Sequence, residues 1–277
     1  MMKITKPNPD GWAQCICPFH ADNNPSASYN VYTGYFVCFG CGLKYNYEQL
    51  TKLLGYKVDR LGSHHVITKA GSILDWRSYY TKAFTTEHKY LLKRGISFRE
   101  RSQYGIRHNN EGVMLPLTSY IASGPPIFHG LVVRRFNEKW GKYHYYIDDN
   151  KKPLCYPAKL KHVGGDLLVI TEGVFGVINV RRHGLEAIAT LGANVDDRFL
   201  EFVEALCQDR NIIVAFDDDY PGLSNALKIA SVSSKIRMIV PGVEADEVSS
   251  KTLTNMIASA VPYHEAYKYY NHYLQDY

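Results

Sequence analysis

Residues 167–180 read LLVITEGVFGVINV and begin with a continuous apolar run that ends at Glu172 and Gly173. Such a run, without polar alternation, is typical of a strand buried on both faces of a parallel sheet. Three later runs repeat the pattern: AIATL (187–191), NIIVAF (211–216) and KIRMIV (235–240). The segments between them carry apolar residues at helical spacing: Phe199, Phe202, Val203 and Leu206, then Leu223, Ala226, Leu227 and Ala230. This alternation predicts right-handed βαβ crossovers and a mostly parallel sheet in an α/β fold.

Acidic residues follow three of these runs. Glu172 comes directly after the first, Asp217 and Asp219 after the third, and Glu244 and Asp246 after the fourth. The carboxyl ends of parallel strands meet at one sheet edge, and the Asp-x-Asp spacing directs two side chains to the same side of an extended segment. Carboxylates gathered there are suited to hold Mg²⁺ or Mn²⁺ for chemistry on phosphates. The alternative interpretation is a set of solvated loop acids or helix N-cap residues.

Near the N-terminus, residues 17–42 read CPFHADNNPSASYNVYTGYFVCFGCG. A Cys-x-x-His pair followed by a Cys-x-x-Cys pair offers four zinc ligands: Cys17, His20, Cys38 and Cys41. We therefore predict a closed structural zinc site. Cys15 is an alternative to Cys17, but its spacing to His20 fits a zinc knuckle poorly. The simpler alternative is that these are ordinary reduced cysteines with no metal.

The chain divides by pattern into five regions. We expect a zinc-binding domain (1–55), a linker (56–86), an α+β subdomain (87–160), the parallel-sheet domain (161–262) and a C-terminal tail (263–277). Within the first region, strands are predicted at 28–32 and 34–38, with a helix at 47–54 that ends at Gly55. A helical piece is expected near 73–83, and further strands at 112–117, 127–134 and 142–146.

Composition and charge narrow the class of protein. The 277 residues carry a formal net charge of +5 and 22 tyrosines, which is mild support for a polyanionic partner. No segment has the uninterrupted apolar length of a membrane span, and the opening residues MMKITKPNPDGW lack the apolar run of a secretion signal. We expect a cytoplasmic protein that does not bind a membrane.

Basic and aromatic residues of the middle region are the candidates for contact with nucleic acid or nucleotide phosphates. They are Arg134, Arg135, Lys142 and Tyr143, with Lys159 and Lys161 just before the first parallel strand. For each basic residue taken alone, the more common interpretation is a solvated surface charge. No P-loop motif occurs, since Gly141-Lys142 is followed by tyrosine.

Taken together, these motifs resemble DnaG-type and phage DNA primases. LLVITEGVFGVINV, IVAFDDDYPGLSNALKIA and VPGVEADEVSS look like the TOPRIM domain of that family, and the CPFH and CFGCG motifs are similar to its N-terminal zinc-binding domain. Between them, YLLKRGIS, YGIR, VMLPL and HGLVVRR resemble the first part of the primase core. The resemblance spans nearly the whole chain in the family's order.

The resemblance implies a nucleotidyltransferase that makes short RNA primers on a single-stranded DNA template from ribonucleoside triphosphates. The zinc domain of this family assists recognition of the template sequence. By matched position, Glu172 would organise metal or manage a proton, and Asp217 and Asp219 would bind metal. Glu244 and Asp246 would complete the acidic cluster.

One position departs from the family pattern. Three residues after Gly173 the family has an aspartate, where this chain has Gly176. A non-catalytic DNA-binding protein with a zinc module and a TOPRIM fold is therefore one alternative, and a TOPRIM nuclease is another. No fused helicase motif is present in the sequence, so a primase of this kind is expected to work with a separate replicative helicase.

Overall fold

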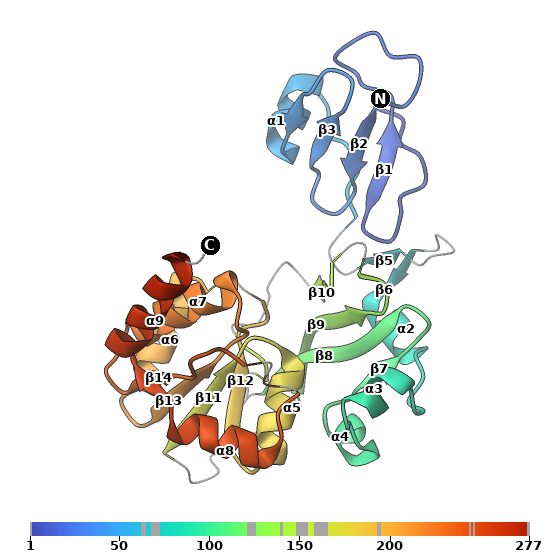
Figure 1. Cartoon of the computed structure of the whole chain (residues 1–277). Coiled ribbons are helices and arrows are strands. Elements are labelled where there is room, and N and C mark those ends of the chain that lie inside the picture. The colour runs from blue at the N-terminus through green and yellow to red at the C-terminus, as the bar shows by residue number, and fades with distance from the viewer. Residues whose placement is uncertain are drawn as a thin grey trace. The chain divides into compact units, whose positions relative to one another are not determined.

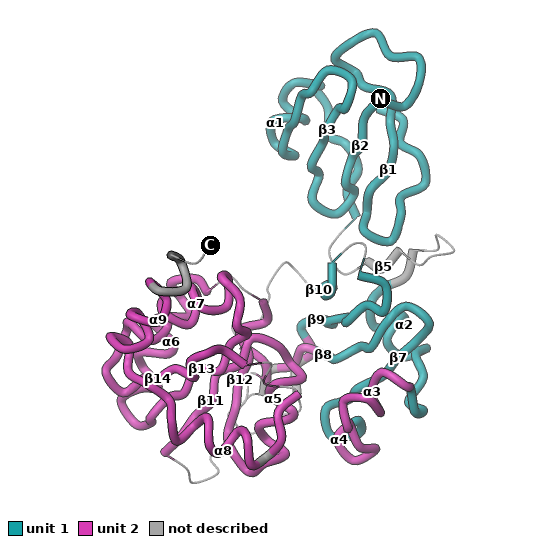
Figure 2. Tube along the Cα trace, viewed as in Figure 1, with its two compact units in different colours: residues 1–88, 101–116, 129–152 teal, residues 89–100, 117–128, 153–277 magenta. Residues whose placement is uncertain are grey.

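The computed structural model describes residues 2–61, 65–67, 73–120, 126–138, 141–147, 155–157, 166–192, 195–243, 245 and 247–275. The chain forms two compact units, which are coloured separately in Figure 2. Unit 1 contains residues 1–88, 101–116 and 129–152, and unit 2 contains residues 89–100, 117–128 and 153–277. Across the described residues, no helix combines the length and hydropathy needed to cross a bilayer.

The N-terminal part of unit 1 is a small antiparallel sheet with one helix. Its elements are β1 (Trp12–Cys15), β2 (Ala27–Asn30), β3 (Phe36–Cys38), β4 (Lys44–Tyr45) and α1 (Tyr47–Leu54), with the strands in the order β1-β2-β3-β4. Helix α1 begins at a capping box, in which Asn46 and Gln49 each bond the other's backbone N–H, and ends at Gly55 with φ 71°. The predicted helix at 47–54 is confirmed.

This module has a core of its own. Tyr29, Phe36 and Leu50 are fully buried in it, together with the side chains of three cysteines. A core this small gives limited stability by itself, and domains of this size commonly depend on a bound metal or disulfides.

The rest of unit 1 is built on a second antiparallel sheet. Its elements are β5 (His65–Ile67), β6 (Ile73–Asp75), α2 (Trp76–Thr81), β7 (Arg107–His108), β8 (Gly112–Tyr120), β9 (Pro126–Arg135) and β10 (Tyr143–Ile147), and the larger sheet has the order β10-β9-β8-β7. Residues 117–120 of β8 and 126–128 of β9 are counted with unit 2. The expected linker does more than connect, because Trp76 and Tyr79 of α2 are buried against Met114 and Leu131 of this sheet. Two short helices, α3 (Lys89–Lys93) and α4 (Phe98–Gln103), lie between α2 and β7 in the sequence.

The larger part of unit 2 is the predicted parallel sheet. Its elements are β11 (Leu167–Thr171), α5 (Val174–Arg182), β12 (Glu186–Ala189), α6 (Asp197–Leu206), β13 (Asn211–Ala215), α7 (Tyr220–Ala230), β14 (Ile236–Met238), α8 (Ser250–Ala258), β15 (Val261–Pro262) and α9 (Tyr263–Gln275). The strand order is β12-β11-β13-β14-β15, and only β15 runs antiparallel to its neighbour. The predicted α/β fold with a mostly parallel sheet is confirmed.

Helices cover both faces of this sheet (Figure 1). Leu168 and Ile170 of β11 point into a buried cluster formed with α6, α7 and α9, while Val169 between them points to the opposite face. Helix α9 lies in the expected C-terminal tail, and its Ala266 is buried in the same cluster. The sheet core therefore fixes the carboxyl ends of the strands on a rigid base.

Candidate zinc centre and acidic sheet edge

Four side chains in the N-terminal module converge on one point. The ligand atoms of Cys17, His20, Cys38 and Cys41 all lie within 4.8 Å of one another. The Sγ atoms of Cys17 and Cys41 are 3.9 Å apart, and Sγ of Cys38 is 3.9 Å from Nδ1 of His20. A Zn–S distance of about 2.3 Å at tetrahedral angles separates two ligand atoms by about 3.8 Å. The donor set and its spacing therefore fit a four-coordinate structural zinc.

Polar groups behind these ligands hold the two knuckles together. Oδ2 of Asp22 accepts hydrogen bonds from the Cys17 N–H at 2.8 Å and from the Ser26 hydroxyl at 2.7 Å, and these bonds lower the Asp22 pKa. The Ser26 hydroxyl also lies 3.5 Å from Sγ of Cys38. Sequence motifs missed Asp22 and Ser26, because the ligand spacing identifies the metal ligands and not the groups that support them.

Hydrogen bonds also favour the thiolate form of Cys38. Burial by itself raises the pKa of this thiol. Hydrogen bonds from the backbone N–H of Cys41 and from the Ser26 hydroxyl outweigh that effect, so the pKa falls to about 6. The thiolate is the form that binds zinc. Cys15 lies on β1 outside the group, and its burial raises its pKa to about 11.

Glu172 and Asp217 follow neighbouring strands at the same edge of the parallel sheet. Thr171, the last residue of β11, is in register with Ala215, the last residue of β13. Glu172 comes next in one strand, and Phe216 and Asp217 follow in the other. Glu172 and Asp217 are half-buried, and Asp219 is exposed.

The turns that carry these acids have specific supports. The Thr171 hydroxyl donates to the carbonyl oxygen of Gly173 at 3.1 Å, which fixes the turn after β11. Asp219 caps helix α7 by accepting the Gly222 N–H at 2.7 Å. A Cβ at Gly222 would lie 2.4 Å from the Asp217 carbonyl oxygen, so this position requires glycine.

The loop after β14 lies against the Asp-x-Asp segment. The Val243 N–H donates to the Phe216 carbonyl at 2.7 Å, and the Gly242 N–H donates to Oδ1 of Asp218 at 3.1 Å. This loop carries the last two predicted metal ligands, Glu244 and Asp246, which lie outside the described residues.

The described acids of this sheet edge are not gathered as closely as the zinc ligands. Within the described ranges, the Cys/His set is the one group of three or more such side chains with ligand atoms gathered in this way. A looser arrangement is compatible with Mg²⁺, which is commonly held by one or two carboxylates and keeps positions for water and substrate phosphates. The assignment of Glu172, Asp217 and Asp219 as metal ligands stays a prediction.

Gly176, the departure from the family pattern, is buried in helix α5. A Cβ at this position would lie 3.0 Å from Cβ of Thr171, 3.1 Å from its Oγ1 and 3.2 Å from Cβ of Ala245. These contacts are already tight for one extra carbon. The structure thus leaves no room for a carboxylate at position 176 without movement of its neighbours.

The predicted nucleic-acid contacts lie together at the paired ends of β9 and β10. Tyr143 is in register with Arg134, whose guanidinium carbon lies 5.6 Å from the Tyr143 ring centre. Arg134 is buried and bonds Glu138 at 2.6 Å, and Arg135 pairs with Asp10 at 2.5 Å. Lys142 is exposed. A role for these residues in binding nucleic acid stays a prediction, and Lys159 and Lys161 lie outside the described residues.

Comparisons with known proteins agree with both halves of this description. Residues 2–58 match the family model described as CHC2 zinc finger, and residues 169–248 match the one described as Toprim-like. The DNA primase of Deinococcus radiodurans is 23% identical over 274 residues, covering 76% of this chain and 48% of the relative. The chain spans about half the length of the curated relatives it matches.

Solved structures show the same fold. The zinc-binding and RNA polymerase domains of the Aquifex aeolicus primase align with a TM-score of 0.51 and 16% identity, over 93% of this chain and 80% of that one. A DnaG primase catalytic domain bound to single-stranded DNA aligns with a TM-score of 0.52 and 16% identity, over 68% of this chain and 78% of that one. The resemblance to DNA primases predicted from the sequence is confirmed, and the matched CHC2 region with its Cys/His group supports zinc as the N-terminal metal.

Proposed function

We propose that this chain is a DNA primase that synthesises short RNA primers on single-stranded DNA by metal-dependent nucleotidyl transfer. The observation that carries the proposal is the acidic edge of the TOPRIM sheet, where Glu172 follows β11 and Asp217 follows its parallel neighbour β13. A zinc-binding module precedes this sheet, in the order found in the primases to which the chain is similar.

The reaction joins the 3′-hydroxyl of a primer end to the α-phosphate of the next ribonucleotide and releases pyrophosphate. A divalent Mg²⁺ or Mn²⁺ ion, when bound, neutralises charge on the phosphate oxygens. Asp217 and Asp219 are the residues proposed to hold it, and Glu172 orients the metal or accepts the hydroxyl proton. Glu244 and Asp246 are proposed as further ligands on grounds of sequence alone.

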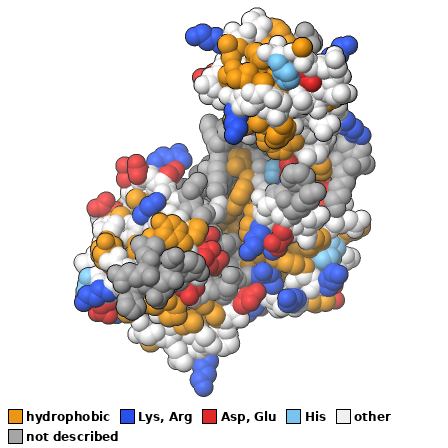
Figure 3. All heavy atoms as spheres, turned by 45° about the horizontal axis from the view of Figure 1, so that its top comes forward, with side chains coloured by type: hydrophobic (Ala, Val, Ile, Leu, Met, Phe, Trp, Pro, Cys, Tyr) orange, Lys and Arg blue, Asp and Glu red, His pale blue; other side chains and the backbone are white. Residues whose placement is uncertain are grey.

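The zinc module is proposed to assist recognition of the template. Phe39 stands between the knuckle residues Cys38 and Cys41, and its side chain is 77% exposed. Apolar side chains reach the surface of this module in Figure 3. Exposed aromatic rings can stack on the bases of single-stranded nucleic acid, at roughly 1–3 kcal/mol per base. Lys142 and the first residue of β10, Tyr143, are proposed as contacts for the template backbone.

A replicative helicase is the proposed protein partner, and the support for it is the similarity to DNA primases.

The test is a set of reactions with single-stranded DNA of mixed sequence and Mg²⁺ or Mn²⁺. One reaction contains labelled ribonucleoside triphosphates, and the other contains end-labelled DNA without nucleotides. The proposal predicts short RNA products in the first and intact DNA in the second. Cleavage without nucleotides would instead establish a nuclease. DNA binding without either product would establish a non-catalytic binding protein.

A further inference from the structure

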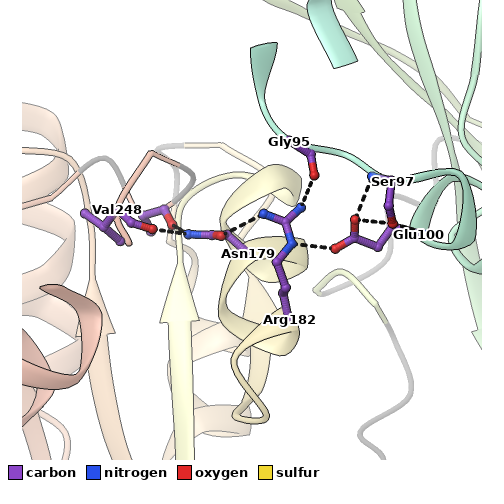
Figure 4. Close-up of polar contacts among 7 residues, drawn as sticks. Gly95, Ser97, Glu100, Asn179, Arg182 and Val248 are labelled. Carbon is purple, nitrogen blue, oxygen red and sulfur yellow. Dashed lines mark hydrogen bonds and ion pairs between the residues drawn. The ribbon is translucent and has the colours of Figure 1, made fainter. Parts of the chain in front are cut away.

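Asn179 on helix α5 makes two hydrogen bonds to residues 66 and 69 positions later in the sequence. Its side chain is 4% exposed, and Nδ2 donates to the carbonyl oxygens of Ala245 and Val248, each at 2.9 Å (Figure 4). Both carbonyls belong to the β14–α8 loop (residues 239–249), of which the structure describes 239–243, 245 and 247–249. One amide thus holds two points of this loop three residues apart.

The orientation of this amide is set by Arg182, one helical turn further along α5. Nη1 of Arg182 donates to Oδ1 of Asn179 at 3.2 Å. Oδ1 is thereby directed toward the guanidinium, and Nδ2 toward the loop. The reverse orientation would place Oδ1 against two carbonyl oxygens and leave three acceptors without a donor.

Arg182 is itself held in place from two sides. Its Nε donates to Oε1 of Glu100 at 2.7 Å, and its Nη2 donates to the Gly95 carbonyl at 2.9 Å. The other carboxylate oxygen of Glu100 accepts both the N–H and the hydroxyl of Ser97, at 2.8 and 2.6 Å. Figure 4 shows this series of contacts from the 95–100 turn to the β14–α8 loop.

Gly176 lies one turn before Asn179 on the same face of α5 and provides the space that the loop needs. A Cβ there would lie 3.2 Å from Cβ of Ala245. Positions three apart on a helix are neighbours, so the loop lies on the helix at Gly176 and is hydrogen-bonded to it at Asn179. Its first part is bonded to the backbone of Phe216 and to Asp218, beside the Asp-x-Asp segment.

From this geometry we propose that Asn179 is a positioning residue, which holds the β14–α8 loop beside the acidic sheet edge and thereby sets the affinity of that edge for a divalent cation. The inference rests on the proposed function, because it assumes that the edge binds metal. Gly176, where the family pattern has a carboxylate, leaves space for the loop to pack on the helix. Asn179 supplies the hydrogen bonds that hold the loop there.

The test compares three variants of the full chain by two measurements that need no catalysis. Asn179→Leu removes both donors, Arg182→Gln releases the orientation of the amide, and Arg181→Met is the matched control. Arg181 lies on the same helix as Asn179, and its guanidinium pairs with Glu186 of β12. Hydrogen exchange of the peptide covering residues 241–249 reports the loop, and electron paramagnetic resonance of added Mn²⁺ reports the metal site.

The proposal predicts that Asn179→Leu exchanges this peptide about tenfold faster or more and weakens Mn²⁺ binding by about 10- to 100-fold. Arg182→Gln should shift both in the same direction by less, and Arg181→Met neither. Unchanged exchange or unchanged Mn²⁺ affinity in Asn179→Leu overturns the proposal. If Asn179→Leu does not fold, the same two measurements on Arg182→Gln decide. If the native protein binds no Mn²⁺ and makes no primers, the proposed function fails and the metal half of this inference fails with it. The exchange comparison still decides the loop half.

Discussion

Gly176→Asp restores the carboxylate of the family pattern, and we predict that it destabilises the protein without strengthening metal binding. Replacing a helical glycine by aspartate gains about 0.3 kcal/mol of helix propensity. Against this gain, a Cβ 3.0–3.2 Å from Thr171 and Ala245 costs about 1–3 kcal/mol of overpacking. Burial of the carboxylate costs about another 1–3 kcal/mol. The net loss in the free energy of unfolding is therefore about 2–6 kcal/mol.

Gly176→Ala separates the two costs. It introduces the same Cβ without the charge and gains about 1 kcal/mol of helix propensity, so its net loss is expected to be about 0–2 kcal/mol. Asn255→Asp on the exposed side of α8 is the control for one added negative charge. The expected order of stability is native, then Gly176→Ala, then Gly176→Asp, with Asn255→Asp equal to native.

Urea unfolding followed by far-UV circular dichroism measures these differences. Tryptophan fluorescence is unsuitable, because Trp12 and Trp76 belong to unit 1, whereas α5 belongs to unit 2. Mn²⁺ affinity is measured on the same samples. A Gly176→Asp protein that is as stable as native, or that binds Mn²⁺ more tightly, would refute the reasoning about this position.

Three further predictions concern the supports of the two sites. Asp22→Ala should raise the zinc dissociation constant about 10- to 100-fold in competition with a chromogenic chelator, while Asp59→Ala should leave it unchanged. Removal of zinc by a chelator should abolish slow hydrogen exchange across residues 2–58, and an unchanged pattern would show that the module folds without metal. Hydrogen bonds from Arg182 and Ser97 overcome the effect of burial and lower the Glu100 pKa below its ordinary 4.5. The native protein should therefore have a larger free energy of unfolding than Glu100→Gln above pH 4.5, and this difference should disappear as the pH falls below 4.5. A difference that does not change with pH would contradict this.

Much of the fold follows from local patterns in the sequence. The apolar run at 167–171 is strand β11 with the predicted bounds, and the helix at 47–54 has the predicted start and end. Both depend on interactions between neighbours in sequence, namely burial on two faces and a capping box. The zinc-ligand group is also local in this sense, because each knuckle is defined by two residues between its ligands.

Contacts between distant segments could not be predicted. Asn179 bonds residues 66 and 69 positions later, and no periodicity or motif marks such a side-chain to backbone contact. Trp76 and Tyr79 lie in a stretch with weak pattern, and only the packing of α2 on the second sheet shows that they are core residues. Gly176 reads in the sequence as a lost ligand, whereas the structure shows it as the place where a loop meets a helix.

The most direct test of the central claim compares two aspartates at opposite ends of one strand. Asp217 follows the carboxyl end of β13, and Asp209 precedes its start. The measurement is incorporation of labelled ribonucleotides on single-stranded DNA with Mn²⁺ or Mg²⁺. The account predicts short RNA from native protein and from Asp209→Ala, and none from Asp217→Ala. Equal synthesis by Asp217→Ala and native protein would contradict the assignment of this edge as the catalytic site.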